Sequence, residues 1–120
     1  MEINELYNKA KFYIDKIKKE KPFYFFERGS SLCLIQSDSD TVFSGTTCIR
    51  INKGNIETVS SEYNAVMSLL ADKKSRAGKI IVVTVDEYKI ASPDTECIQM
   101  LIQADSDNAR CRIILSESES

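Results

Sequence analysis

Two short polar segments carry the side chains best suited to chemistry. Thr58–Ala65 contains Glu62 near the start of an expected helix, and Ser92–Cys97 brings two acids and a thiol to the start of another. A positioned carboxylate can transfer protons, and thiols and carboxylates are potential metal ligands. Both segments also have a structural explanation, because Ser at a cap, Pro at the first helical position and acids in the first turn favour a helix start.

The spacing around Glu62 sets its direction. Glu62 lies three and four residues before Ala65 and Val66, which places its carboxylate on the apolar face of the helix. Burying a carboxylate is costly without a partner, although the free amides of a helix N-terminus lower that cost. Two alternatives follow: a buried functional group, or a glutamate that complements the helix dipole and turns outward.

The second segment shows a similar placement. Asp94 and Cys97 are three residues apart and share the helical stripe that continues into Ile98 and Leu101. Preferences for helix starts do not explain that stripe. We therefore expect polar groups at two successive helix starts to face the same core.

The elements that must position these groups follow from hydrophobic periodicity and turn residues. The polar turn 37–40 predicts a hairpin, and Lys53-Gly54-Asn55 predicts a loop. The expected elements are a helix over Glu2–Lys21 ending at Pro22, strands over Ser30–Gln36 and Thr41–Ile51, a helix over Ser60–Asp72, a strand over Lys79–Val85, a helix starting at Ser92-Pro93 and a strand over Arg110–Leu115.

This order, α-β-β-α-β-α-β, predicts an α/β fold, a three-layer α/β/α sandwich with a mixed sheet. The length of 120 residues suits one domain over residues 1–120, with a frayed tail at 116–120. The aromatic run at 23–26 is interpreted as core or interface packing in preference to a platform for stacking bases.

Composition excludes several classes of function. The net charge of −2 argues against a large nucleic-acid footprint, and the lysines between Lys9 and Lys21 are interpreted as the solvated face of a helix. No apolar stretch approaches the roughly 20 residues that span a bilayer, and no signal-peptide pattern is visible. We therefore expect no membrane contact and a cytoplasmic location. The absence of His removes the usual catalytic triads and His-based metal sites.

The four cysteines are expected to be reduced thiols, since the sequence shows no export signal. Cys33, Cys48 and Cys111 lie in or beside apolar runs, which indicates core packing. Only Cys97 lies near the candidate site.

On this element order, the spacing of Thr58–Ala65 and Ser92–Cys97 resembles the zinc-dependent cytidine deaminase family, including its blasticidin-deaminase-like members. In that family the first helix start reads Cys or His, any residue, Glu, and the second reads Pro-Cys-x-x-Cys. Three Cys or His side chains hold a zinc ion that activates water. The glutamate transfers the proton from that water.

The resemblance assigns a role to each matching residue. Glu62 matches the catalytic acid/base, Pro93 the motif proline and Cys97 one metal ligand, whereas Ser60 and Asp94 occupy the other two ligand positions. A neutral serine hydroxyl is a poor zinc ligand, and a carboxylate with a thiolate is an atypical pair. The resemblance therefore implies a degenerate zinc site.

The nucleoside pocket is altered as well. Nucleoside-specific members have an Asn and a Glu that hold the ribose, and Thr47 and Ile49 occupy those positions here. An isoleucine cannot accept a bond from a ribose hydroxyl. Ser61 is the third residue equivalent to a pocket position.

Three functional hypotheses follow. The first is a cytidine-deaminase-like protein without zinc or another cofactor, catalytically impaired, that binds a small heterocyclic ligand or serves assembly. The alternative is an active hydrolytic deaminase of cytidine, blasticidin or another aminated heterocycle, with zinc and with Glu62 as acid/base. The third is an unrelated α/β domain whose helix starts match by chance. The resemblance also implies a homo-oligomer, a dimer or a tetramer.

Overall fold

The structure is a computed structural model that describes residues 3–20, 30–72 and 76–115. Pro22, the aromatic run at 23–26 and the expected tail at 116–120 lie outside the described residues. The elements are α1 (Ile3–Glu20), β1 (Ser31–Ser37), β2 (Val42–Thr46), β3 (Cys48–Asn52), β4 (Asn55–Val59), α2 (Ser61–Ala71), β5 (Ala77–Thr84), β6 (Ile90–Ala91), α3 (Thr95–Ala104), the 3-10 helix η1 (Ser106–Arg110) and β7 (Arg112–Ile113).

The main sheet is mixed, as predicted. Its strands run in the order β2-β1-β5-β6, and β7 also pairs with β5. The pairs β1–β2, β1–β5 and β5–β6 are antiparallel, whereas β5–β7 is parallel. All seven residues of β1 are buried, which is expected of a central strand covered on both faces.

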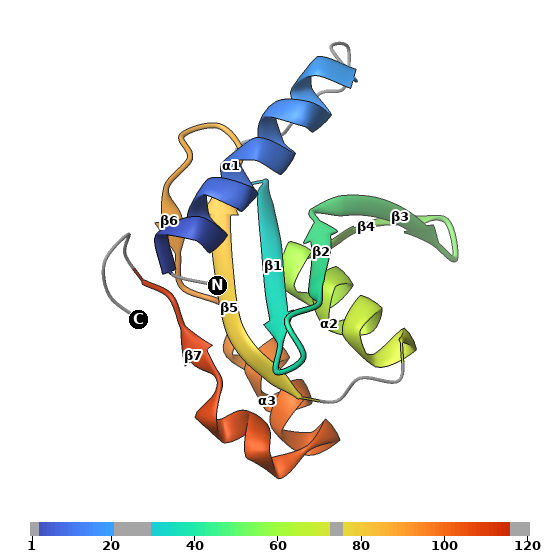
Figure 1. The fold of residues 1–120 in the computed structure, drawn as a ribbon. Coiled ribbons are helices and arrows are strands. Elements are labelled where there is room, and N and C mark those ends of the chain that lie inside the picture. Colours follow the sequence, from blue (N-terminus) through green and yellow to red (C-terminus); the bar gives the residue numbers. More distant parts are fainter. Residues whose placement is uncertain (1–2, 21–29, 73–75, 116–120) are drawn as a thin grey trace.

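Helices cover both faces of this sheet and complete the predicted three-layer α/β/α sandwich. Leu32 and Leu34 pack in one core cluster with α1, and the alternate residues Cys33 and Ile35 pack in a second cluster with α2 and α3. Figure 1 shows α1 on one side of β1 and β5, with α2 and α3 on the other. Alternate residues of β1 therefore pack into two separate cores, one on each face of the sheet.

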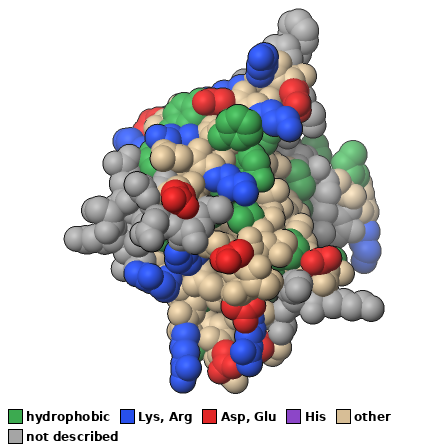
Figure 2. Space-filling model, viewed as in Figure 1, with side chains coloured by type: hydrophobic (Ala, Val, Ile, Leu, Met, Phe, Trp, Pro, Cys, Tyr) green, Lys and Arg blue, Asp and Glu red, His purple; other side chains and the backbone are tan. Residues whose placement is uncertain are grey.

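The first helix is amphipathic, as its periodicity predicts. Leu6, Ala10 and Ile14 are buried against the sheet, whereas Phe12 faces solvent. Basic and acidic side chains are interspersed on the face of the molecule shown in Figure 2. Within the described residues, no helix is both long and apolar enough to cross a membrane.

The turn between β5 and β6 is fastened to α1. Tyr88, whose φ is 57°, accepts a bond at its carbonyl from the Tyr7 hydroxyl at 2.6 Å. The Tyr88 hydroxyl donates to Asp15 at 2.6 Å and accepts from Lys18 at 3.1 Å. These bonds fix the segment that leads into β6 and then to the start of α3.

One expected strand is wrong. Thr41–Ile51 is not continuous, because the chain leaves the main sheet at Thr47 and continues as β3. The turn at Lys53 and Gly54, with φ of 52° and 81°, then reverses the chain into β4, which the sequence prediction missed. Two successive residues with positive φ are typical of the type I′ turn that joins hairpin strands.

The β3–β4 hairpin forms a separate two-stranded sheet that extends away from the main sheet (Figure 1). Ile51 and Ile56 face each other in its register and are 78% and 75% exposed. The hairpin thus carries one exposed apolar pair beside its polar turn, and β4 leads directly into α2.

Candidate functional site

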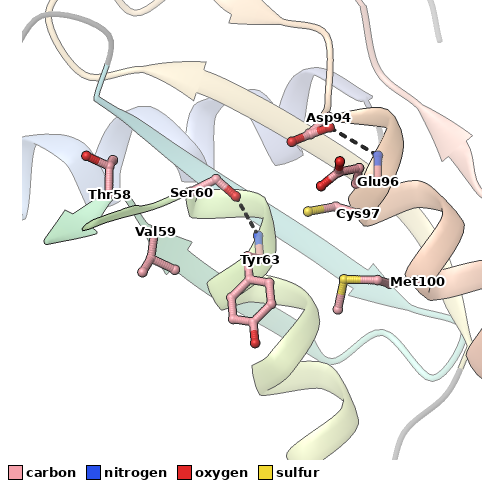
Figure 3. A pocket seen from close by; sticks show the side chains of 8 residues that line it. All are labelled: Thr58, Val59, Ser60, Tyr63, Asp94, Glu96, Cys97 and Met100. Carbon is pink, nitrogen blue, oxygen red and sulfur yellow. Dashed lines mark hydrogen bonds between the residues drawn. The ribbon is translucent and has the colours of Figure 1, made fainter. Parts of the chain in front are cut away.

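The starts of α2 and α3 enclose two adjoining cavities. The first has a volume of about 340 Å³ and is lined by Thr58, Val59, Ser60, Tyr63, Asp94, Glu96, Cys97 and Met100 (Figure 3). The second, of about 330 Å³, is lined by Ser31, Thr47, Thr58, Ser60, Glu62, Val82, Thr84, Ala91 and Ser92. Thr58 and Ser60 contribute to both. Of the predicted site residues, Thr47, Ser60, Glu62, Asp94 and Cys97 therefore come together here.

Ser60 is the N-cap of α2. Its extended backbone, with φ of −68° and ψ of 154°, lets the side-chain oxygen accept a bond from the amide of Tyr63 at 3.1 Å. Such a cap typically contributes about 1 kcal/mol to stability. The hydroxyl at the first ligand-equivalent position therefore serves the helix itself.

Asp94 has the same role in α3. Its carboxylate accepts a bond from the amide of Glu96 at 3.0 Å, and the helix begins at Thr95. The prediction that Ser92 caps this helix, with Pro93 as its first residue, is wrong by two positions. The second ligand-equivalent position is thus also a helix cap.

Glu62 joins the two helix starts. It is only 8% exposed, which decides between the two alternatives in favour of a buried carboxylate. One carboxylate oxygen accepts from the Ser61 hydroxyl at 2.8 Å, and the other accepts from the backbone amide of Asp94 at 3.0 Å. Hydrogen bonds to a charged acceptor are stronger than neutral ones, so this carboxylate links α2 firmly to α3.

A chain of hydroxyl groups continues from Glu62 to the central strand. The Ser31 and Ser61 oxygens are 2.6 Å apart, and the single proton of Ser61 is already donated to Glu62. Ser31 must therefore donate to Ser61. Thr47 accepts at its hydroxyl from the backbone amide of Ser31 at 3.0 Å, which anchors the chain where β2 ends.

Ser61 and Thr47 thus both belong to the network around Glu62. Ile49, the third residue equivalent to a pocket position, lies on β3 opposite Thr58. Its side chain lies outside the described part of the structure.

Gly45 allows β2 to pass directly against α2. A Cβ atom added at Gly45 would lie 2.3 Å from the amide nitrogen of Ala65 and 2.5 Å from the carbonyl oxygen of Ser61. The Asn64 side chain then donates to the carbonyl of Thr46 at 2.8 Å. This close approach sets the position of Thr47 relative to Glu62.

Cys97 lies in the first turn of α3 and faces Ser60 across the first cavity (Figure 3). Burial raises the pKa of the Cys97 thiol; the hydrogen bond with Ser60 works in the opposite direction, and the charge of Glu62 adds to the rise. Because the thiolate is the form that binds metals and attacks electrophiles, this environment favours the unreactive thiol.

The donor set does not fit a zinc ion. Structural and catalytic zinc sites use thiolates, imidazoles or carboxylates in tetrahedral arrangement. Here the three positions offer the capping hydroxyl of Ser60, the capping carboxylate of Asp94 and the single thiol of Cys97. Over residues 3–20, 30–72 and 76–115, no group of three or more His, Cys, Asp or Glu is placed to hold a metal ion.

Several residues of the cavities were not singled out from the sequence. Thr58 could not be placed without the hairpin that ends in β4. The sequence pattern around Tyr63 and Met100 indicates only positions within a helix and does not place them in a cavity. Ser31 carried a usable signal, since it is a polar residue at the start of a strand that is buried throughout.

Comparisons with known proteins give a likeness in structure alone. No family model matches the chain, and no curated protein matches it. Cytidine deaminase from Mycobacterium leprae superposes with a TM-score of 0.65 and 12% identity, over 93% of this chain and 89% of that one. Cytidine deaminase from Mycobacterium tuberculosis superposes with a TM-score of 0.59 and 15% identity, over 83% of this chain and 79% of that one. A point mutant of that enzyme superposes with a TM-score of 0.63 and 16% identity, over 89% of this chain and 80% of that one. The chain therefore has a cytidine deaminase-like fold.

Proposed function

We propose that this protein is a deaminase-fold module that holds no zinc and does not deaminate, and that it binds a small heterocyclic ligand or serves assembly. The observation that carries the proposal is the use of Ser60 and Asp94. Both side chains cap the helix that follows them. Each capping bond uses one acceptor position, and what these two positions offer a metal is a neutral hydroxyl and a carboxylate, a poor donor set for zinc beside one thiol.

The network around Glu62 supports the same proposal. Both oxygens of its carboxylate accept bonds from the protein, one from Ser61 and one from the amide of Asp94. Within the proposal, Glu62 acts as an internal connection between α2 and α3. In this proposal Glu62 shares the position of a proton-transferring glutamate because the fold is shared, and it does not transfer protons itself.

The alternative is an active hydrolytic deaminase of cytidine, blasticidin or another aminated heterocycle that uses Glu62 as acid/base. One observation favours it: Glu62 lines the second cavity and can be reached from there. That alternative needs a metal-activated water at Ser60, Asp94 and Cys97, whose donor chemistry does not fit zinc.

The test combines elemental analysis with an activity assay. Protein is purified with zinc supplied, dialysed against a mild chelator and measured for zinc per chain. It is then assayed for ammonia release from cytidine, deoxycytidine and blasticidin with zinc added. We expect well under one zinc per chain and no metal-dependent ammonia. About one tightly held zinc per chain, the content of a structural or catalytic site, would overturn the proposal.

We also propose that the chain assembles as a dimer or tetramer. The exposed pair Ile51 and Ile56 on the projecting β3–β4 hairpin supports this proposal, because apolar pairs of this kind gain by burial at an interface. Light scattering after gel filtration measures the oligomer. A mass equal to one chain at all concentrations would refute it.

A further inference from the structure

The two edges of the main sheet differ in length. Beyond β5 lie β6 and β7, with two residues each, whereas β2 forms the opposite edge with five residues (Figure 1). Proteins commonly protect an edge strand by shortening it or by placing charged residues or proline in it. The sequence of β2, Val-Phe-Ser-Gly-Thr, contains no charged residue and no proline. The long edge of the sheet therefore lacks these forms of protection against pairing with another strand.

The pairing of β1 with β2 shows which backbone groups of β2 point outward. The amide of Thr47 donates to the carbonyl of Ser31 at 3.1 Å. In an antiparallel pair, such bonded positions alternate with positions whose amide and carbonyl face away from the partner strand. The observed register therefore turns the amides and carbonyls of Val42, Ser44 and Thr46 outward.

The side chain of Asn64 limits the open part of this edge. It donates to the carbonyl of Thr46 at 2.8 Å, which agrees with a carbonyl that faces away from β1. Ser44, in the middle of β2, is exposed. Within residues 3–20, 30–72 and 76–115, no hydrogen bond reaches the outward amides and carbonyls of Val42 and Ser44. The open edge thus runs from Val42 to the amide of Thr46.

A groove of about 490 Å³ lies beside this edge, and its lining includes Tyr13 and Ile17 of α1, Leu32 of β1 and Ser44. In the register Ser44 is opposite Leu34, which packs in the core cluster with α1, so the side chain of Ser44 lies on the α1 face of the sheet. Residues directly opposite each other in neighbouring strands share a face. A residue paired with Ser44 in an added strand would therefore direct its side chain toward the apolar side chains of the groove.

The packing of α2 decides which kind of strand fits this edge. A Cβ atom added at Gly45 would lie 2.3 Å from the amide nitrogen of Ala65, so α2 lies directly over β2. A second copy that paired through its own β2 would bring its own α2 into the same layer. Paired strands are about 4.8 Å apart, whereas packed helices need about 8–10 Å between their axes. The two helices would overlap, whereas a single extended segment without a covering helix fits.

We propose that the open edge of β2 and the groove beside it bind an extended peptide segment of a partner protein, which adds to the sheet as an antiparallel strand. The segment has apolar side chains at alternate positions, and these pack against Tyr13, Ile17 and Leu32. In this mode of recognition the main-chain bonds supply affinity and the alternate side chains supply selectivity. The described lining of the groove shares no residue with the two cavities at the starts of α2 and α3, so this surface is separate from the candidate site.

The test uses the end-blocked peptide Lys-Val-Thr-Val-Thr-Val-Lys and two N-methylated forms of it, with binding measured from NMR shifts of the β2 amides. In the proposed pairing the valines face the groove and their amides donate to β2, whereas the threonine amides point away. N-methylation of the central valine should weaken binding at least about tenfold, and N-methylation of the threonine before it less than about threefold. The absence of saturable shifts in β2, or an equal loss with both N-methylated forms, would overturn the proposal.

Two pairs of variants locate the binding. Ser44→Pro removes an amide that points outward and does not bond to β1, and it should weaken peptide binding at least about tenfold, whereas Ser44→Ala keeps that amide and is the control. Ile17→Glu places a charge in the groove and should weaken binding to a similar extent, whereas Phe12→Glu, at a 63% exposed position of the same helix, should not. If Ser44→Pro does not fold, the second pair decides. Equal binding by the two members of a folded pair would contradict the proposal.

Light scattering after gel filtration tests the other occupant, a second copy of the chain. If β2 pairs with a second copy, the parent should have a larger mass than Ser44→Pro at the same concentration, and that result would overturn the inference. Equal masses, together with peptide binding by the parent and not by Ser44→Pro, would support it.

Discussion

Replacing Glu62 is the substitution with the clearest expected effect on stability. In Glu62→Ala the backbone amide of Asp94 and the hydroxyl of Ser61 both lose their acceptor. The Ser61 hydroxyl can turn toward the Ser31 oxygen, 2.6 Å away, whereas the amide of Asp94 loses the acceptor that the structure gives it. Glu62→Gln differs, since its amide oxygen can still accept from the amide of Asp94.

The Gln variant also tests the direction of the hydroxyl chain. Its NH₂ group must donate to the Ser61 oxygen, so the Ser61 proton has to turn toward Ser31. Ser31 can then donate to Thr47, whose hydroxyl oxygen is 3.4 Å away. The chain can reverse without a broken bond, and we expect Glu62→Gln to cost only about 1 kcal/mol.

The cost of Glu62→Ala is larger. A hydrogen bond to a charged group contributes about 1.5–3 kcal/mol, which gives roughly 3–6 kcal/mol for the two bonds together. Removing the carboxylate also removes the cost of burying it, which offsets part of that loss. We therefore expect a net loss of about 2–4 kcal/mol, a large fraction of the stability of a small domain.

Urea unfolding followed by circular dichroism measures this loss. With an m-value of about 1.5–2 kcal/mol/M, the midpoint of Glu62→Ala should fall by roughly 1–2.7 M. Glu87→Ala, at an exposed position, is the control and should stay within about 0.5 kcal/mol of the parent. A Glu62→Ala protein as stable as this control would show that the carboxylate does not connect α2 to α3.

Three further substitutions probe the frame of the site. Gly45→Ala places a methyl group against the backbone of Ala65, and we expect a loss of about 3 kcal/mol or more in thermal or urea unfolding. Burial raises the pKa of the Cys111 thiol from 9.0 to about 11. The contribution of the neutral thiol to folding stability is therefore complete below pH 9 and is lost as the pH rises toward 11. The decline in unfolding free energy over that range should be smaller in Cys111→Ala. Asn108→Ala removes the acceptor of the Ala77 amide and should cost about 2–4 kcal/mol by the same unfolding assay.

The burial of Glu62 was predictable from local spacing. Its position three and four residues before Ala65 and Val66 places it on the apolar face of α2, and the structure has it there. The residue that caps α3 was not predictable in this way. Ser92 and Asp94 are both good caps, and the choice depends on the bond from the Asp94 amide to Glu62, which comes from a distant part of the chain.

The β3–β4 hairpin was missed for a related reason. Residues 41–51 are rich in β-branched and apolar residues, which favours strand at both ends, and the polar run 44–47 with Gly45 does not by itself say where the strand breaks. The break comes from tertiary contacts: Gly45 packs on α2, and the Thr47 amide bonds to the carbonyl of Ser31 at 3.1 Å. The turn at Lys53-Gly54 did carry a signal, because a glycine between two β-branched runs favours a hairpin.

The central claim is that Ser60, Asp94 and Cys97 meet at one site, where a hydroxyl, a carboxylate and a single thiol are too poor a donor set to hold zinc. The most direct test compares zinc per chain in the parent and in the double variant Ser60→Cys/Asp94→Cys, after the same dialysis against a chelator. We expect well under one zinc in the parent and about one in the double variant, since three converging thiolates suit zinc. A parent that retains about one zinc, or a double variant that gains none, would contradict it.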